Sequence, residues 1–497
     1  MSAKRYHPLI MVLEVFGLVK SFGFIALYLF VIRLGSDSSF VFYGRIAFLC
    51  VLAFSIVTIF LKWQTHRYEV EDESFHLYSG IFTKSKQTIP FSRIQNVNRR
   101  TTFIHKLFKM TSMQFETSMS GDDASIEFKM ITKSEAELLE DMVKKRPAVS
   151  SELQESEDLE EVPEIKAVDN RIIHFTPTRK DLIRASFTSL SFLLLIPVVG
   201  SLFSNFNEVI SIEEEAQGLL SSLPQTWWFY ALAAAIIIIA SVLFGVVRTF
   251  LKYGNYVIAS DEERIYITKG VLDETAFSIS KSRVQAIEMI QTPLKRILGL
   301  AEVKLTSAGG VGIGEENLEI NSLYPFLPVQ RANEIIEELL PAYSVTKNMK
   351  KLPKKSLWIR LLRPSWIWII ATIALFIFKP EPFDIDIAWW LISILLLVII
   401  AGLRVLDYLN SQYVINDHFI QMKSGSLSTT LFVTKRDKII EINVTRGFLQ
   451  KKFGLATIGT VNRSKPVHHS GIDDIPDELA SLFMNWYRER RQEITIK

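Results

Sequence analysis

The sequence has few of the residues and patterns that usually mark an enzyme. A single cysteine, Cys50, among 497 residues excludes a disulfide framework and a cysteine-based metal site. A net charge of +3 predicts no large basic surface, so we expect no nucleic-acid partner. No small-residue cleavage site follows the basic residues near the start, so the first apolar stretch is expected to be a retained membrane helix.

Motifs for nucleophilic or metal-dependent catalysis are also missing. No Gly-x-Ser-x-Gly or His-Glu-x-x-His pattern occurs. The glycine-rich stretch 309–314 lacks the lysine and hydroxyl that end a phosphate loop. His468 and His469 are adjacent, so regular backbone would point them apart, and no third ligand is near. We predict no enzyme activity, no catalytic residues, no cofactor and no metal site.

Long apolar runs are the main feature that is present, and they come in three pairs. A membrane-spanning helix needs about 20 mostly apolar residues. The fifth run is short and would rely on Leu361 and Leu362, with the charged ends of Arg360 and Arg363 reaching back to the membrane surface. The six runs cover approximately residues 9–32, 46–63, 182–203, 227–247, 365–378 and 387–403.

The charges around these runs predict their orientation. The segment between the third and fourth runs holds glutamates and no lysine or arginine, whereas the opposite flanks are basic, as at Arg179, Lys180 and Arg184. Because cytoplasmic loops are enriched in lysine and arginine, both termini and the segments between the pairs are predicted to be cytoplasmic. We expect a multi-pass protein whose first partner is the lipid bilayer.

One pattern follows each pair of apolar runs and occurs three times. Each copy has a five-residue block, a glycine 13 residues before the block, and a second anchor 16 residues after the block's first residue. Two intervals kept without a gap indicate an internal repeat of three equivalent modules. In the three copies these positions are Gly80, Arg93 and Lys109; Gly270, Arg283 and Gly299; and Gly425, Lys438 and Gly454.

Each module is predicted to contain strands followed by a helix. In 264–269, Ile265 and Ile267 alternate with polar residues and precede the glycine, which indicates a half-buried strand that ends in a hairpin turn. Residues 329–340 place apolar side chains at helical spacing. Several antiparallel strands and one closing helix make an α+β unit of roughly 80 residues.

This order resembles a pleckstrin-homology-like (PH-like) domain. The resemblance rests on the hairpin glycine, on the Ile-Pro-Phe-x-Arg-Ile-Gln-x-Val block at 89–97 and on the Lys-Arg-x-Leu-Gly-Leu block at 295–300. The pattern is similar to that of bacterial membrane-associated PH-domain proteins, in particular their long, YdbT-like members with three such domains. The resemblance implies a non-enzymatic protein of the bacterial cell (inner) membrane that acts as a scaffold or in envelope protection, in complex with a shorter PH-domain membrane protein.

The expected architecture is an α+β membrane protein in which three transmembrane helical hairpins alternate with three PH-like antiparallel β domains, each closed by a C-terminal helix. An acidic stretch without basic residues, 150–164, predicts a solvated spacer. The predicted boundaries are 1–65 for hairpin 1, 66–147 for PH-like domain 1, 148–178 for the acidic linker, 179–252 for hairpin 2, 253–343 for PH-like domain 2, 344–406 for a linker with hairpin 3, and 407–497 for PH-like domain 3.

Recurring basic residues are the candidates for binding an anionic lipid or a partner. Basic groups near the inner leaflet gain about 1 kcal/mol each from its negative potential. A structural ion pair, or a side-chain stem packed over the sheet, is the favoured alternative, because one basic residue per domain is weak evidence for a lipid site. The candidates are Arg93, Arg283, Lys438, Lys106, Arg296 and Lys451.

Two charges, Glu14 and Lys20, fall inside the first apolar run. Intramembrane charges often mark a transport path or a partner contact. These two are six residues apart and do not pair well on one helix face, and Glu14 could instead lie at the membrane interface. Two alternatives to a scaffold therefore stay open, namely an export or transport component for a small amphiphile or peptide, and a sensor of anionic lipid.

Overall fold

The computed structural model describes residues 4–33, 38–71, 73–81, 83–117, 125–144, 171–188, 227–307, 322–343, 345–379, 389–464 and 467–492. The chain divides into two compact units, Met1–Asp261 with Tyr266–Ser278, and Glu262–Ile265 with Ile279–Lys497. The sequence of the second module is split between them. The acidic stretch 150–164, most of the third apolar run and the glycine-rich stretch 309–314 lie outside the described residues.

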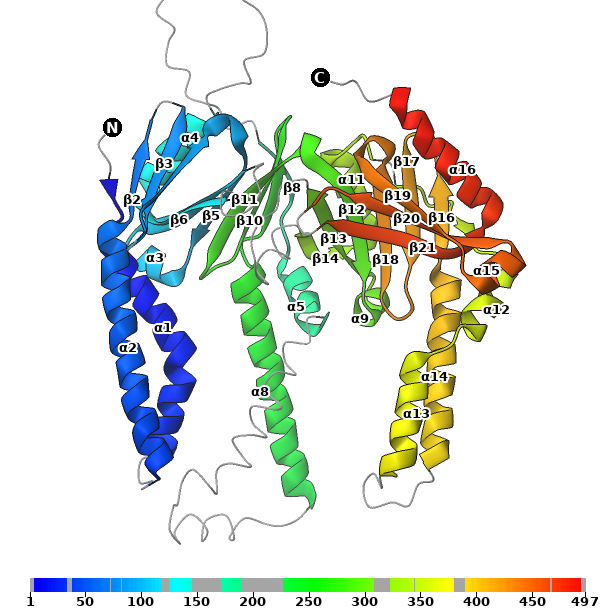
Figure 1. Cartoon of the computed structure of the whole chain (residues 1–497), viewed down its shortest axis with the longest axis horizontal. Helices are drawn as coiled ribbons and strands as arrows, with labels where there is room; N and C mark the ends of the chain where they lie inside the picture. Colours follow the sequence, from blue (N-terminus) through cyan, green and yellow to red (C-terminus); the bar gives the residue numbers. More distant parts are fainter. Residues whose placement is uncertain are drawn as a thin grey trace, which may run out of the picture. The chain divides into compact units, whose positions relative to one another are not determined.

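The first unit contains two antiparallel sheets (Figure 1). One has four strands in the order β1-β2-β3-β4, and the other has seven in the order β7-β6-β5-β11-β10-β9-β8. The strands are β1 (Lys4–Arg5), β2 (Arg67–Val70), β3 (Ser74–Ser79), β4 (Ser85–Pro90), β5 (Ile94–Thr101), β6 (Met110–Thr117), β7 (Ser125–Thr132), β8 (Ile172–Phe175), β9 (Val257–Ser260), β10 (Arg264–Lys269) and β11 (Glu274–Ser280). The helices are α1 (Ile10–Leu27), α2 (Ser39–Thr65), α3 (Phe103–Leu107), α4 (Lys133–Lys144), α5 (Arg179–Thr188) and α8 (Trp227–Tyr253).

The second unit repeats this plan. Its seven-stranded sheet has the order β14-β13-β12-β18-β17-β16-β15, and a three-stranded sheet has the order β19-β20-β21. The strands are β12 (Val284–Gln291), β13 (Leu300–Ser307), β14 (Ser322–Pro328), β15 (Lys350–Lys351), β16 (Gln412–Ile415), β17 (Phe419–Ser424), β18 (Thr429–Lys435), β19 (Ile439–Thr445), β20 (Leu455–Asn462) and β21 (His468–Pro476). The helices are α9 (Pro293–Ile297), α11 (Val329–Leu339), α12 (Lys354–Leu362), α13 (Trp366–Phe378), α14 (Trp389–Asn410), α15 (Phe448–Phe453) and α16 (Asp477–Arg488).

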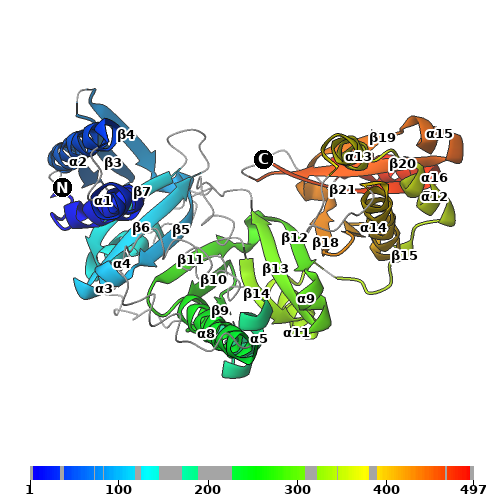
Figure 2. The ribbon, with the colours of Figure 1, turned by 90° about the horizontal axis from the view of Figure 1, so that it is seen from below.

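Among the described residues, four helical segments are long and apolar enough to cross a membrane. In both views α1 lies beside α2, and α13 lies beside α14 (Figures 1 and 2). Large apolar side chains such as Phe24, Phe40 and Phe54 stay exposed on these helices, which suits contact with lipid. The four segments are Ile10–Phe30, Ser39–Thr65, Lys354–Phe378 and Trp389–Asn410, and α8 covers the fourth apolar run.

The first and third pairs of membrane helices are inserted between two strands that pair with each other. In the first unit Lys4 of β1 lies opposite Tyr68 of β2, and α1 and α2 lie between these two strands in the sequence. In the second unit Lys350 of β15 lies opposite Tyr413 of β16, and α13 and α14 lie between these two strands in the sequence. Strand β8, within the segment 148–178, pairs with β9 in the same way. Each of these pairings therefore joins a strand that precedes helices to a strand that follows them.

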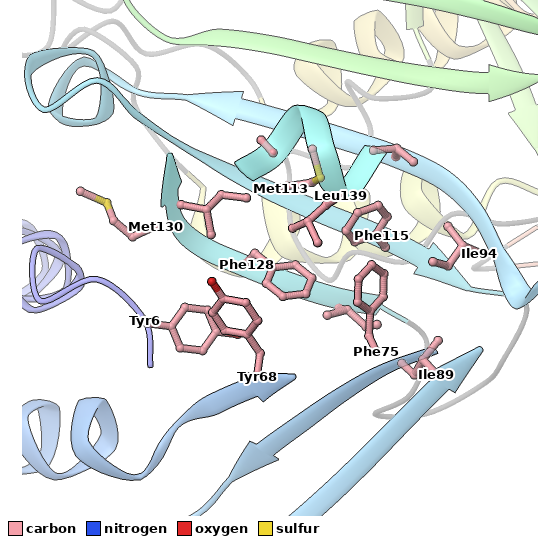
Figure 3. Close-up of a cluster of buried hydrophobic side chains, with 14 of the residues drawn as sticks. Tyr6, Tyr68, Phe75, Ile89, Ile94, Met113, Phe115, Phe128, Met130 and Leu139 are labelled. Atoms are coloured by element: carbon pink, nitrogen blue, oxygen red, sulfur yellow. The ribbon is translucent and has the colours of Figure 1, made fainter. Parts of the chain in front are cut away.

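The core of the first PH-like module is aromatic (Figure 3). Phe75, Phe115 and Phe128 have no exposed surface, and the Phe75 ring centroid lies 5.0 Å from that of Phe115 and 5.4 Å from that of Phe128. Tyr6, which follows β1, packs on the same cluster, and its carbonyl accepts a 3.0 Å hydrogen bond from the Trp63 indole near the end of α2. Both ends of the α1–α2 hairpin are thus anchored to this core.

The predicted glycine turns are confirmed. The three hairpin glycines have left-handed backbone, and a Cβ at Gly270 would lie 2.0 Å from the Asp273 carbonyl oxygen, so only glycine fits there. The second anchor is left-handed in all three copies as well, including Lys109 of the first copy. The φ angles are +107° at Gly80, +98° at Gly270, +121° at Gly425, +56° at Lys109, +66° at Gly299 and +68° at Gly454.

Candidate functional site

The PH-like modules are joined through the edges of their sheets. Strand β5 of the first module pairs antiparallel with β11 of the second, and β12 of the second pairs with β18 of the third. Each seven-stranded sheet is therefore three strands of one module continued by four strands of the next (Figure 1). An unpaired edge strand offers a row of free N–H and C=O groups, and each hydrogen bond made there is worth about 1 kcal/mol.

The two junctions have the same register. Asn98 lies opposite Phe277 in the first, and Glu288 lies opposite Phe432 in the second. Asn98 follows Arg93 by five residues, as Glu288 follows Arg283, and both phenylalanines come seven residues after their hairpin glycine. Because a slip of one residue would turn every side chain to the other face, a shared register indicates a specific mode of assembly.

The second junction is closed by buried polar contacts. The Thr434 hydroxyl donates to the Gln285 carbonyl at 2.8 Å, and the Asn462 amide donates to the Thr434 hydroxyl at 2.7 Å. Ala286, Thr434 and Asn462 have no exposed surface. These contacts link strands β12, β18 and β20, so the junction is continuous with the core of the third module.

Lys106, one of the predicted binding residues, lies at the first junction. Its ammonium donates to the Val271 carbonyl at 2.6 Å and lies 3.5 Å from the Glu274 carboxylate. Close by, the Phe103 backbone N–H at the start of α3 donates to the Asp273 carboxylate at 3.0 Å. Helix α3 therefore contacts the turn between β10 and β11 through hydrogen bonds and an ion pair.

Arg296 occupies the place of Lys106 in the second module and reaches the equivalent hairpin through Asn410. Its guanidinium donates to the Asn410 side-chain oxygen at 3.4 Å, and the Asn410 amide donates to the carbonyls of Gly425 and Ser426 at 2.9 Å. Burial, together with the charge of Arg296, lowers the pKa of Lys423. The second junction thus keeps the basic residue and replaces the acidic partner with an amide.

The first residues of the three blocks have different surroundings. Lys438 donates to the Ser282 carbonyl at 3.2 Å, which places it at the second junction, and lies 3.6 Å from Asp437. Arg283 is half-buried, and burial together with the positive charges of Arg264 and Arg463 lowers its pKa. Arg93 is exposed. Lipid binding by these residues remains a prediction.

Lys451, the third counterpart of Lys106 and Arg296, is exposed on α15. No hydrogen bond or ion pair of its side chain is found within the described part of the chain. The structure therefore brings Lys106, Arg296 and Lys438 to module junctions, and it leaves Arg93 and Lys451 at the surface.

The two charges of the first apolar run are separated by the structure. Glu14, on α1, makes a 2.9 Å ion pair with Lys129 of β7. Burial lowers the pKa of Lys129, but the hydrogen bond and the charge of Glu14 outweigh it, so the net pKa is raised. Glu14 therefore lies at the end of α1 that faces the first PH-like module, whereas Lys20 is exposed further along the helix.

A buried ionic cluster connects helices α12 and α14 with the third module, and the sequence interpretation missed it. The Arg360 guanidinium donates to Asp474 at 3.3 Å, to Asp407 at 2.7 Å and to the Ser411 hydroxyl at 3.0 Å. Arg360 is 5% exposed and Asp474 is fully buried. Gln450 of α15 also donates to Asp474, at 2.7 Å.

The expectation that Arg360 reaches back to the membrane surface is therefore wrong, whereas for Arg363, whose side chain is 45% exposed, it stays a prediction. Arg363 pairs with Asp473 at 3.1 Å and with Asp474 at 3.2 Å. The buried carboxylate of Asp474 needs a positively charged partner, because an unpaired buried charge is very costly, and Arg360 supplies it. A break at Pro364 separates α12 from α13, so α12 can turn to pack on the third module.

Comparisons with known proteins agree with the repeat. The bacterial PH domain family (bPH_2) matches residues 15–147, 196–343 and 368–491. The chain is 25% identical over 488 residues to the UPF0699 transmembrane protein YdbT of Bacillus subtilis (strain 168), and the alignment covers 97% of this chain and 98% of that protein. No solved structure matches the chain.

Proposed function

This chain belongs to the bacterial PH domain family, and on that basis we propose that it is a non-enzymatic scaffold of the bacterial cell membrane. In this proposal three transmembrane hairpins alternate with three PH-like domains, each closed by a C-terminal helix. The helices α4, α11 and α16 follow the last strand of their modules and support this arrangement. The hairpins hold the modules at the membrane surface, and the modules assemble through their sheet edges.

The edge-to-edge pairing of β5 with β11 and of β12 with β18 carries the proposal. Addition of a strand to a sheet edge is a recurrent mode of protein recognition, because main-chain hydrogen bonds supply the affinity. A chain that uses this mode twice in one register is well suited to recruit further modules. We therefore propose a shorter PH-domain membrane protein as the partner, in a complex that protects the cell envelope.

The modules are proposed to lie in the cytoplasm. Basic residues flank the hairpins on the module side, as at Lys62 in the last turn of α2 and at Arg67 of β2. Such residues favour the cytoplasmic side of the membrane. Anionic lipids of the inner leaflet are then within reach of exposed Arg93 and Lys451.

A transport function has less support than a scaffold. It would need charges within the helix bundle, and Glu14 instead pairs with Lys129 of the first module. A dedicated lipid sensor also has less support, because the charged groups of Lys106, Arg296 and Lys438 form hydrogen bonds at the junctions.

The experiment that tests the scaffold function is purification of the native protein from its own cells in a gentle detergent, followed by mass spectrometry. We expect a stoichiometric PH-domain membrane protein to copurify. A lone chain that carries a bound lipid or peptide would contradict the scaffold function and favour the sensor or the transporter.

A further inference from the structure

We propose that strand β19 is a docking edge for the four-stranded sheet of a PH-like domain in a different protein chain, one that carries an acidic hairpin before its outer strand. This inference rests on the proposed scaffold function and names the surface and the chemistry of the partner. The strands equivalent to β19 are β5 and β12, and both are covered by the next module. Within the described residues β19 is the outer strand of the sheet β19-β20-β21, and no strand covers it.

The side chains of β19 show the effect of the missing neighbour. In β12, Ala286 is fully buried and Met289 is 6% exposed. The residues at the same positions of β19 are Glu441, which is exposed, and Val444, which is half-buried. The equivalent positions are therefore buried in the second module, where β18 pairs with β12, and more exposed in the third module, where β19 is an outer strand.

The first carbonyls of the equivalent strands are satisfied from within their own modules. The Tyr343 hydroxyl donates to the Val284 carbonyl at 2.9 Å, and Arg490 donates to the Ile439 carbonyl at the same place of β19. Pairing between modules begins two residues further on, at Ala286. The stretch of β19 that remains available is therefore 441–445, which corresponds to residues 286–290 of the paired stretch 286–291 of β12.

The register of the two existing junctions predicts that of the third. The residue five positions after the block's first residue faces the residue seven positions after the partner's hairpin glycine. In β19 the first of these is Asn443. A partner strand would therefore dock antiparallel, with the residue that follows its hairpin glycine by seven positions opposite Asn443.

Charge selects the kind of partner. At the first junction Lys106 and the start of α3 face Asp273 and Glu274. In the third module the equivalent α15 presents exposed Lys451 and Lys452. An acidic hairpin in the incoming domain would pair with these lysines, as Glu274 pairs with Lys106.

A second copy of this chain is poorly suited to the site. Its own outer strand, β4, is preceded by Thr83 and Lys84 at the positions that Asp273 and Glu274 occupy in the second module. Docking of β4 on β19 would place Lys84 against Lys451, and like charges across an interface disfavour that pairing. The occupant is therefore a different chain with acidic residues at these two positions.

The test converts a second copy into the proposed partner. Full-length protein in detergent, with Cys50→Ser to remove the native thiol, carries Asn443→Cys. A differently tagged full-length copy carries Gln87→Cys, seven residues after Gly80, with Thr83→Asp and Lys84→Glu to imitate Asp273 and Glu274. We expect a disulfide between the copies under mild oxidation, because directly opposed Cα atoms lie within reach of one.

Three matched controls define the result. Val444→Cys in place of Asn443→Cys points to the other face of β19 and should not cross-link. Lys451→Glu should lower the yield several-fold, and so should retention of Thr83 and Lys84. If the Gln87→Cys copy that keeps Thr83 and Lys84 cross-links as well as the acidic copy, the selection by charge is overturned. No disulfide between copies that keep their thermal unfolding temperature would overturn the docking edge.

Failure of this inference and failure of the scaffold function have different signatures. A photo-reactive amino acid at position 443, introduced in living cells, should capture the partner that copurifies with the native chain. If a stoichiometric partner copurifies but is not captured from position 443, the scaffold function stands and the docking edge is refuted. If the acidic copy docks in vitro but no partner copurifies, the edge is supported and the scaffold function is refuted.

Discussion

Arg360 of α12 donates a hydrogen bond to Asp474 of β21, 114 residues further along the chain. The carboxylate has no exposed surface, and Asp474 has a left-handed backbone with φ +62°. The pair, together with Asp407 of α14, joins helices α12 and α14 to the sheet of the third module. The helices and the module are therefore in direct contact at this point.

Replacement of Arg360 is predicted to separate the third hairpin from the third module. Arg360→Ala leaves the buried Asp474 carboxylate without its main partner, which should lower the stability of this part by about 3–5 kcal/mol. Arg363→Ala is the matched control and should cost about 1 kcal/mol or less, because Arg363 is 45% exposed. Thermal unfolding in detergent and protease sensitivity measure both. Similar losses in the two variants would contradict a special role for Arg360.

The Glu14–Lys129 pair is predicted to be a modest link between α1 and the first module. A double-mutant cycle with Glu14→Gln and Lys129→Met should give a coupling energy of about 0.5–1 kcal/mol, since both side chains are partly exposed. Because the pKa of Lys129 is raised above its ordinary value of 10.5, the contribution of the pair should be complete at neutral pH and be lost only as the pH rises beyond that value. Coupling that disappears between pH 7 and pH 9 would contradict this assignment.

The register of the first junction is predicted to be trappable by a disulfide. On the Cys50→Ser background, Arg99→Cys with Ala276→Cys places two thiols on directly opposed residues of β5 and β11, so they should oxidise within one chain. Arg100→Cys with Ala276→Cys is one residue out of register and turns one thiol to the other face. Gel mobility and titration of free thiols distinguish the two. Efficient cross-linking of the second pair would refute the register.

The hairpin glycine of the second module is predicted to be essential to the first junction. Gly270→Ala forces a Cβ into the Asp273 carbonyl and should lower stability by about 2 kcal/mol or more, with loss of the Arg99→Cys/Ala276→Cys cross-link. Gly299→Ala meets no atom within 4 Å and should cost only about 1 kcal/mol, the strain of its left-handed backbone. Chemical denaturation in detergent compares them. An equal cost for both would show that the close approach to Asp273 does not matter.

Contact between Lys106 and the acidic hairpin is predicted to depend on charge. Lys106→Glu places a carboxylate beside Asp273 and Glu274, which should weaken the first junction, and Glu274→Lys in the same chain should restore much of the loss. Hydrogen exchange of the β5 and β11 amides reports on the junction. Absence of rescue in the double variant would indicate that Lys106 acts through its bond to the Val271 carbonyl alone.

The local elements of the molecule could be read from the sequence, because they depend on neighbouring residues. The constant spacing of Gly80, Gly270 and Gly425 predicts three hairpin turns, since a left-handed backbone at these points requires glycine. Apolar runs long enough to span a bilayer predict α1, α2 and α14. The repeat and the resemblance to bacterial PH domains follow from the same local signals.

Only the tertiary structure decided how the modules meet and where the charges act. Nothing in the alternation of β5 or β11 says that these strands pair, because an edge strand has the same sequence pattern whether it faces water or another strand. From the sequence, Lys106 is a candidate for lipid binding because it is basic. In the structure its contact with Glu274 makes it part of a junction. The sequence places Arg360 at the membrane surface, but the fold brings Asp474 beside it. A buried charge is stabilised by its partner in space, and sequence neighbours do not identify that partner.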